Sequence, residues 1–227
     1  MPARLRQSPA YAKSGLSDPR AEMHIGLGAQ GRYCGPELSG RKMRSLNRVV
    51  MQKASRDWIT SLGPEKLDVL ELSGKWGQTF PFRTYRCLNR WKFDPCKGPL
   101  LDDGGKVVRF DLVMANQVWE HLDRPYAATR TIYRMLRKGG WFWVAVPFLA
   151  PFHGAPVDCS RWTARGLQNL LIEGGFDEAR VQSFQWGNRH VAQRNLELPW
   201  PPEHRDDDDL SNDPDFPVVS WAMAQKD

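Results

Sequence analysis

The stretch FDLVMANQVWEHLDRPYAATRTIYRMLRKGGWFWVAVP, residues 110–147, contains the pattern of a strand, a helix and a second strand. Residues 107–115 form a short apolar run that predicts a buried strand. Residues 124–136 place apolar side chains at helical spacing and are followed by the glycine pair 139–140, a common helix terminator. Residues 141–146 then predict another buried strand, which ends at a proline. This order favours a parallel sheet covered by helices.

The same alternation extends to both sides of this stretch. Helices are predicted over residues 43–62 and 164–172, the latter capped by Thr163, and strands over residues 67–72, 83–88, 179–186 and 217–224. Strands that alternate with helices at this spacing predict a doubly wound α/β sheet. Ligands of such sheets bind beyond the carboxyl ends of the strands, where the strand order reverses. We therefore expect the site in the loops after Leu72, Leu88, Ala115 and Val146.

The composition indicates one soluble globular domain with an additional segment. The chain has 227 residues, of which 41% are hydrophobic and 26% are charged. A domain of this size buries enough surface to fold without disulfides or a structural metal. Its longest apolar stretch is too short to span a bilayer, so we expect a cytoplasmic protein with no membrane partner. The four cysteines form no CxxC pair, which argues against a zinc knuckle or a redox motif.

The net charge of +6 is unevenly distributed along the chain. Residues 1–48 contain 9 Lys and Arg against 3 acidic residues, whereas residues 201–227 contain 2 against 8. We expect residues 1–41 to be a basic flexible extension, for which a transit peptide and a nucleic-acid-binding arm are alternatives. An acidic loop, residues 203–215, is expected before the last strand. Its four consecutive aspartates predict a solvated loop, because no calcium-loop spacing surrounds them.

Residues 110–147 resemble the fourth strand, the Glu-His pair, the helix and the fifth strand of the class I S-adenosylmethionine-dependent methyltransferases. The small-molecule branch called type 11 is the most similar, and the resemblance spans residues 67–176, with a weaker fit to residue 226. It implies a Rossmann-like fold with a seven-stranded type of sheet, mostly parallel with an antiparallel last strand. It also implies S-adenosylmethionine as cofactor and residues 42–227 as the methyltransferase domain.

The segment VLELSGKWG, residues 69–77, resembles the cofactor-binding turn of this family. Glycines in such a turn let the backbone approach the cofactor closely. The family pattern of acid, x, Gly, x, Gly, x, Gly retains Gly77 here, with Ser73 and Lys75 at the first two glycine positions. Under the resemblance, Glu71 is the acid that meets the cofactor's ammonium group. Cofactor contacts are expected from Glu71, Ser73, Gly74 and Gly77.

Four further residues are expected at the cofactor. Asn89 stands where the family has a ribose-binding acid, and its amide can accept one hydrogen bond and donate another. Asp94 resembles the family's adenine-binding acid, with a helix-cap role as the alternative. Asn116 and Gln117 follow the family's fourth strand and would line the adenine or methionine end.

The segment PFHGAPVDCSRWT, residues 151–163, resembles a loop that reaches over the acceptor pocket in part of the type 11 branch. His153 is the expected base for an acceptor hydroxyl or amine, with Asp158 or Arg161 orienting its ring or binding an acidic acceptor. The alternative is that these three residues only lock the loop. We assign His153 and Asp158 to catalysis, and His121, Arg161 and Trp162 to substrate binding.

Glu120 and His121 raise the question of a metal site. Adjacent residues on a helix point in different directions and do not easily share one ligand, so we expect a structural role for at least one of the two, and we assign no metal.

The predicted function is methyl transfer to the O, N or C atom of a small-molecule acceptor in biosynthesis, such as a sugar, a glycoside intermediate or a secondary metabolite. One alternative is a catalytically degenerate protein that serves as a binding or partner subunit. Another, less favoured, is a nucleic-acid methyltransferase that uses the basic arm, and a nucleotide dehydrogenase is favoured least. A homodimer is one assembly to be expected.

Overall fold

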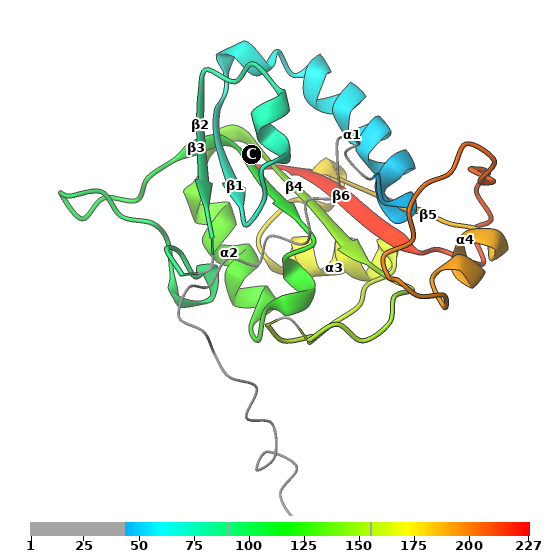
Figure 1. Cartoon of the computed structure of the whole chain (residues 1–227). Helices are drawn as coiled ribbons and strands as arrows, with labels where there is room; N and C mark the ends of the chain where they lie inside the picture. The colour runs from blue at the N-terminus through cyan, green and yellow to red at the C-terminus, as the bar shows by residue number, and fades with distance from the viewer. Residues whose placement is uncertain (1–43, 90, 155) are drawn as a thin grey trace, which may run out of the picture. The chain divides into compact units, whose positions relative to one another are not determined.

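The computed structural model describes residues 44–89, 91–154 and 156–227. The predicted extension, residues 1–41 with Cys34, lies outside the described residues, as does Met43 at the start of the first predicted helix. The described strands form one six-stranded sheet in the order β2-β1-β3-β4-β6-β5 (Figure 1). These strands are β1 (Asp68–Leu72), β2 (Thr84–Leu88), β3 (Phe110–Asn116), β4 (Leu136–Pro147), β5 (Val181–Trp186) and β6 (Val219–Gln225).

The pairing of the strands confirms a mostly parallel sheet with an antiparallel last strand. β1 pairs in parallel with β2 and β3, and β3 pairs in parallel with β4, whereas β6 runs antiparallel between β4 and β5. The described residues form six strands rather than the seven of the family type. The segment between β2 and β3 makes only an isolated bridge between Leu101 and Val107, around a turn closed by Asp102, and adds no edge strand.

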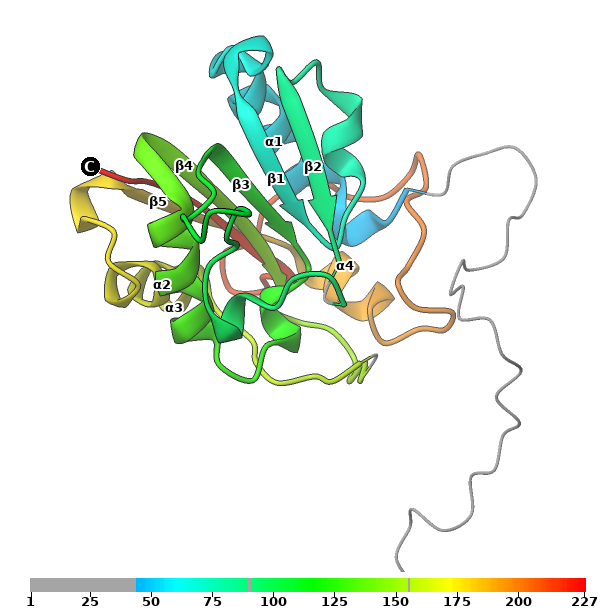
Figure 2. The same cartoon turned by 90° about the vertical axis from the view of Figure 1, so that its left-hand side faces the viewer.

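Helices cover both faces of the sheet (Figure 2). α2 (Pro125–Met135) and α3 (Ala164–Glu173) pack on one face, and α1 (Val49–Ser61) and α4 (Arg189–Arg194) pack on the other. The predicted N-cap of α3 is confirmed, because the Thr163 hydroxyl accepts a hydrogen bond from the Gly166 amide at 3.1 Å. α4 was not expected from the sequence, since six residues are too few to show a helical period.

Neighbouring residues of the central strands point alternately into two hydrophobic clusters. Leu70, Val113 and Val144 pack toward α2 and α3, whereas Val69, Leu112 and Trp143 pack toward α1 and α4. A strand that is buried on both faces is typical of a parallel sheet, and it explains the continuous apolar runs in the sequence.

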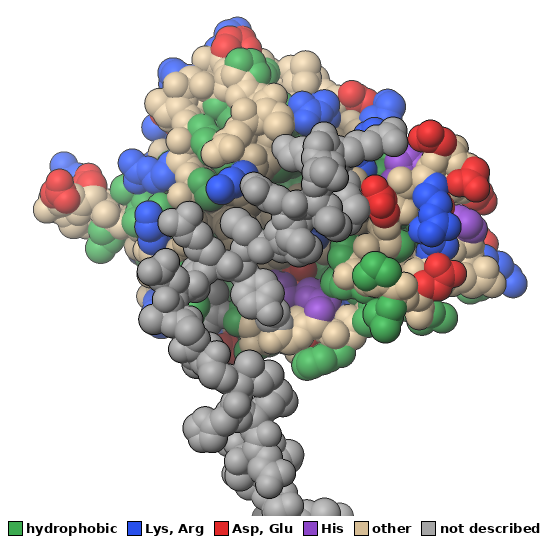
Figure 3. All heavy atoms as spheres, in the orientation of Figure 1, with side chains coloured by type: hydrophobic (Ala, Val, Ile, Leu, Met, Phe, Trp, Pro, Cys, Tyr) green, Lys and Arg blue, Asp and Glu red, His purple; other side chains and the backbone are tan. Residues whose placement is uncertain are grey.

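The acidic loop differs from the expected solvated loop at one position. The side chain of Asp208 is only 1% exposed and accepts hydrogen bonds from Arg194 at 2.6 Å and His190 at 3.0 Å, with His204 at 3.2 Å. A buried arginine needs a paired anion, and Asp208 provides it, so this aspartate fixes the loop to α4. Acidic and basic side chains are intermixed on the surface over α4 and the segment after it (Figure 3).

The path of the chain creates a crevice at the carboxyl end of the sheet. From β1 the chain passes to β2 on one side and then to β3 on the other, so β1 and β3 flank the point where the strand order reverses. This is the expected location of a ligand site in a doubly wound sheet. Among the described residues, no helix is long and apolar enough to cross a membrane.

Candidate active site

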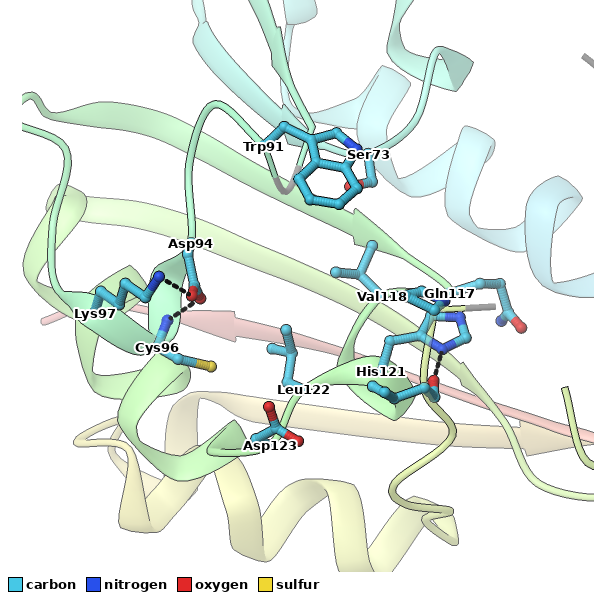
Figure 4. Close-up of a pocket in the computed structure, with 12 residues that line it drawn as sticks. Ser73, Trp91, Asp94, Cys96, Lys97, Gln117, Val118, His121, Leu122 and Asp123 are labelled. Atoms are coloured by element: carbon cyan, nitrogen blue, oxygen red, sulfur yellow. Dashed lines mark hydrogen bonds and ion pairs between the residues drawn. The ribbon is translucent and has the colours of Figure 1, made fainter. Parts of the chain in front are cut away.

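A pocket of about 440 Å³ opens at the carboxyl ends of β1, β2 and β3. Its volume lies within the range of small-molecule sites. In Figure 4, Trp91 lies beside Ser73 on one side of the pocket, and Gln117, Val118 and His121 lie together on another. The remaining lining residues are Asp94, Cys96, Lys97, Leu122, Asp123, Pro156 and Val157. The pocket lining thus draws residues from all four loops that the sequence predicted.

Ser73 and Gln117 give this pocket its backbone shape. Each follows directly after a strand, and each has a φ of 57°, which is uncommon for residues other than glycine. The turned backbone is held by two hydrogen bonds, from the Ser73 amide to the Leu88 carbonyl at 2.9 Å and from the Gln117 amide to the Ala145 carbonyl at 2.8 Å. Such conformations concentrate at ligand sites, where the surrounding structure supports them.

Two buried polar atoms at the end of β3 have no hydrogen-bond partner among the described residues. They are Oδ1 of Asn116 and Nε2 of Gln117. A buried polar group without a partner destabilises the fold, so such atoms call for a ligand or ordered water. Together with Ser73 and Asp94, Gln117 is a predicted cofactor residue that the structure brings into the pocket, and Asn116 lies next to it in sequence. The donor set therefore fits a polar ligand of cofactor size.

The position of Glu71 differs from the expectation. Its buried carboxylate accepts hydrogen bonds from the amides of Trp76 at 3.1 Å and Gly77 at 2.7 Å, and from the Tyr85 hydroxyl at 2.5 Å. It does not line the pocket. The turn after β1 contracts into a 3₁₀ turn, Trp76–Thr79, whose first amides lie over this carboxylate. Glu71 therefore closes the turn, and the assignment of its carboxylate to the cofactor's ammonium group is not supported by this geometry.

The close packing of this turn around Glu71 requires glycine at positions 74 and 77. A Cβ atom on Gly74 would lie 2.0 Å from a Glu71 carboxylate oxygen, and one on Gly77 would lie 2.4 Å from the ring of Tyr85. Neither glycine lines the pocket, in contrast to the predicted cofactor contacts. Lys75, at an expected glycine position, is exposed and also lies outside the pocket lining.

The two candidate residues after β2 have different roles. Asn89 is exposed, lies outside the pocket lining, and accepts a hydrogen bond from the Lys92 amide at 3.2 Å, which closes a turn. Asp94 lines the pocket, but its Oδ1 accepts from the Cys96 amide at 3.0 Å as the cap of a 3₁₀ turn. The cap role, the alternative from the sequence, is therefore present. Trp91 lines the pocket and is 82% exposed, but it was not predicted from the sequence as a site residue. Its position just after the end of β2 is the sequence feature that could have indicated this role.

Beside this pocket, Glu120, His121 and His153 form a compact group, which we call the carboxylate–histidine group. One ligand atom from each lies within 4.8 Å of the other two. Nε2 of His121 is 3.8 Å from Oε1 of Glu120, and the two imidazole ring centroids are 5.0 Å apart. The geometry thus allows residues 120 and 121 to approach one ligand although they are adjacent in sequence. They lie on a 3₁₀ turn, Trp119–His121, and the rule for an α-helix face does not transfer to it.

Burial controls the ionisation of this group. The Glu120 side chain is fully buried, neither of its oxygens has a hydrogen-bond partner among the described residues, and burial raises its pKa to about 8. Burial likewise lowers the pKa of His153, so its imidazole is neutral at neutral pH. Nε2 of His153 is buried and unpartnered among the described residues.

Asp158 and Arg161 hold the loop that carries His153. Asp158 accepts hydrogen bonds from the His153 backbone amide at 2.9 Å and from both terminal nitrogens of Arg161, one of them at 2.7 Å. The Arg161 guanidinium, and then the His153 amide, hold the pKa of Asp158 down at about 2. Among the described residues, no hydrogen bond joins either side chain to the His153 ring, and the contacts of Asp158 are with the loop backbone and Arg161. Trp162 packs against the hydrophobic cluster on the α2 and α3 side and, like Arg161, does not line the pocket.

Comparison with known proteins gives one family match. Residues 99–144 match the family model described as methyltransferase domain. This match covers β3, α2 and much of β4, and includes part of the pocket lining and two members of the carboxylate–histidine group. The search of curated proteins found no match.

Several solved structures are similar to this chain at low identity. A SAM-dependent methyltransferase from Thermotoga maritima has 13% identity and a TM-score of 0.46, covering 81% of this chain and 100% of its own. A SAM-dependent methyltransferase from Archaeoglobus fulgidus has 13% identity and a TM-score of 0.45, covering 79% and 94%. Phosphoethanolamine N-methyltransferase 2 from Haemonchus contortus has 10% identity and a TM-score of 0.46, covering 77% and 53%.

The family match and the observed order of strands agree with the resemblance of residues 110–147. The segment that matches the methyltransferase-domain family model, residues 99–144, is thus the segment on which the resemblance depends, and it makes up less than half of the chain.

Proposed function

We propose that this chain is a class I S-adenosylmethionine-dependent methyltransferase of type 11. It transfers the methyl group of S-adenosylmethionine to a hydroxyl or amine of a small-molecule acceptor, such as a sugar, a glycoside intermediate or a secondary metabolite. Transfer to a carbon nucleophile belongs to the same proposal. The observation that supports it best is the pocket at the carboxyl ends of β1, β2 and β3, which has His121 in its wall. A pocket of this size accommodates small ligands rather than a polymer chain.

In this proposal the strand-end residues bind the donor. The bound sulfonium supplies an activated methyl group, and transfer requires the acceptor atom to lie in line with it at about 3 Å. Ser73 and Gln117 present polar groups on a preformed backbone, and Asp94 presents a carboxylate. The exposed ring of Trp91 offers a face on which an adenine ring or a cation can stack.

The carboxylate–histidine group marks the acceptor end. His121 lies at the pocket wall, and the neutral imidazole of His153 lies against it, with Nε2 lacking a hydrogen-bond partner among the described residues. His153 is the residue that we propose acts on the acceptor. Asp158 and Arg161 keep its loop in place, because they bind the loop backbone and each other.

The proposed domain bounds, cellular location and assembly depend on the sequence alone. We infer that residues 42–227 form the methyltransferase domain, preceded by the basic extension, and that the enzyme acts in cytoplasmic biosynthesis. A homodimer is the assembly to test first.

Calorimetric titration of S-adenosylmethionine and S-adenosylhomocysteine into the full-length protein tests this proposal. We expect one binding site per chain with micromolar affinity for each ligand. Folded protein that releases no heat at high ligand concentration would contradict the proposal. With binding established, a screen of hydroxyl- and amine-containing acceptors identifies the substrate class, and methylation of nucleic acid without any small-molecule activity would contradict the acceptor assignment.

A further inference from the structure

We propose that Glu120, His121 and His153 bind one divalent transition-metal ion beside the pocket. The group supplies one carboxylate oxygen and two imidazole nitrogens, all within 4.8 Å of one another. Two imidazoles with one carboxylate suit zinc and the neighbouring first-row metals better than magnesium or calcium, which prefer oxygen ligands. Bonds of about 2.0–2.2 Å to a tetrahedral ion keep ligand atoms roughly 3.4 Å apart, so small side-chain movements complete the site.

The buried polar atoms of this group are favourable ligands for a cation. Both carboxylate oxygens of Glu120 and Nε2 of His153 are buried and lack a hydrogen-bond partner among the described residues. Desolvating such groups without a partner is unfavourable, and buried carboxylates are normally paired or bound to metal. A single ion between the three side chains would satisfy all of these atoms at once.

The two histidines are already oriented for metal binding. Nδ1 of His121 lies 2.5 Å from the Val157 carbonyl oxygen, which requires the proton to be on Nδ1 and leaves the lone pair on Nε2. That nitrogen faces Glu120. A hydrogen bond from the second ring nitrogen to a carbonyl is the usual support of a metal-bound histidine. His153 is fixed through its backbone amide by Asp158, and its ring stacks on Trp200 with centroids 4.9 Å apart.

The charged residues nearby do not already satisfy Glu120. Arg161 interacts with it electrostatically, but its guanidinium is bound by Asp158 on two nitrogens. Arg48 also interacts with Glu120 through charge, without a hydrogen bond to either oxygen. Protonation of Glu120 is therefore the competing explanation for its unpartnered oxygens, and metal binding distinguishes the two.

The ion would lie at the border of the pocket, because His121 contributes both to the metal group and to the pocket lining. Three protein ligands leave an open coordination position, as in catalytic zinc sites. Resting here on the proposed function, we infer that this position takes a hydroxyl oxygen of the acceptor. A bound cation lowers the pKa of such a hydroxyl, and His153 then acts as a ligand of the ion rather than as a free base.

Metal titration of the full-length protein tests the site directly. After treatment with a chelator and its removal, Zn²⁺ is titrated by calorimetry and Co²⁺ by visible absorption. We expect one ion per chain, with the intense d–d bands of a four-coordinate cobalt site. Glu120→Gln and His153→Ala should each weaken Zn²⁺ binding at least a hundredfold. His190→Ala is the matched control, because His190 pairs with Asp208 outside the group, and it should bind Zn²⁺ like the wild type.

Circular dichroism and thermal unfolding verify that each variant is folded. If His153→Ala does not fold, Glu120→Gln, which keeps the size of the side chain, provides the same test. Wild-type protein that binds no Zn²⁺, or variants that bind it as tightly as the wild type does, would overturn the metal site and favour a protonated Glu120. Titration of S-adenosylhomocysteine into the metal-free protein separates the two proposals, because cofactor binding without Zn²⁺ binding refutes only the metal site. Zn²⁺ binding without cofactor binding refutes only the proposed function.

Discussion

Ser73 and Gln117 adopt the same left-handed backbone conformation, with a φ of 57° at each, after two neighbouring parallel strands. The register that pairs Leu72 with Ala115 brings the two turns side by side, and both residues line the pocket. Ser73 stands at a position where the family that residues 69–77 resemble has glycine. The structure gives the physical reason for that glycine, because the backbone there is one that residues with a Cβ atom adopt only at a cost.

Replacing Ser73 by valine is expected to lower the free energy of unfolding by about 1–2 kcal/mol, since a β-branched side chain is poorly accommodated in this conformation. Ser73→Gly should leave stability unchanged or slightly raised. Ser183→Val is the matched control, because Ser183 lies in β5, where valine is favoured. Urea unfolding measures all three. Equal stability of Ser73→Val and Ser183→Val would show that the turn is not strained.

Gly77→Ala is expected to destabilise the fold by about 1–3 kcal/mol through overpacking. The new methyl group would lie 2.4 Å from the Tyr85 ring and 2.8 Å from a Glu71 oxygen. Gly104→Ala is the control, since a Cβ there meets only an Asp102 oxygen at 3.4 Å. Denaturant unfolding reports stability. If Gly77→Ala were as stable as Gly104→Ala but bound S-adenosylhomocysteine weakly, Gly77 would contribute to cofactor binding rather than to packing.

The strands could be predicted because burial on both faces of the sheet produces continuous apolar runs in the sequence. The long helices could be predicted because each packs one side on the sheet, so that apolar residues recur about every 3.6 positions. Thr163 and the glycine pair 174–175 marked the two ends of α3 through local chemistry. The pair 139–140 was wrongly predicted to end a helix, because α2 ends at Met135 and β4 begins directly at Leu136, so both glycines lie within the strand. α4 could not be found in this way, since its six residues complete fewer than two turns. The switch of strand order between β1 and β3 also placed the pocket correctly, because topology alone determines where the crevice opens.

The individual site residues were less predictable, since their roles depend on contacts that spacing does not show. Glu71 fits the family pattern in sequence, but the short turn after β1 folds its amides onto the carboxylate. Glu120 and His153 are separated by the whole of α2 and β4, and only the fold brings them together. Trp91 could not be distinguished from the other tryptophans in the sequence, because only the folded chain shows which tryptophan side chain is exposed at the pocket.

Asp68 should contribute to the acid sensitivity of this protein. Hydrogen bonds and ion pairs from Arg83, followed by Thr84 and Arg137, hold its pKa well below the usual range. Because the folded-state pKa lies below the unfolded value, its stabilisation is present above about pH 4 and is lost as the pH falls further. Asp68→Asn should cost about 1 kcal/mol at pH 7 and make unfolding less dependent on pH below 4.

The control for this change is Asp57→Asn, which removes an exposed pair with Lys53 and should alter stability by less than about 0.5 kcal/mol. Thermal unfolding between pH 2 and 7 gives both profiles. If Asp68→Asn retained the full acid dependence of the wild type, other carboxylates would have to account for it.

Trp91→Ala should weaken binding of S-adenosylhomocysteine about tenfold, consistent with the loss of one stacking contact of roughly 1–1.5 kcal/mol. Stability should be unchanged, because the side chain is 82% exposed. Tyr126→Ala, an aromatic truncation on α2 outside the pocket lining, should bind the ligand like the wild type. Calorimetry measures affinity, and unaltered binding by Trp91→Ala would exclude this ring from the cofactor site.

Asp158→Asn should separate positioning of the His153 loop from cofactor binding. The neutral amide keeps the shape of the side chain but loses the charge that pairs with Arg161 and strengthens the bond from the His153 amide. We expect Zn²⁺ affinity and turnover to fall by about tenfold or more, as for supporting residues of metal sites, with the affinity for S-adenosylhomocysteine unchanged. Glu178→Gln, which removes an exposed pair with Arg165, should change none of these quantities. Asp158 contacts the loop and does not line the pocket. If Asp158→Asn lost cofactor affinity and Zn²⁺ affinity equally, the variant would have unfolded the loop as a whole. The proposed positioning role would then be wrong.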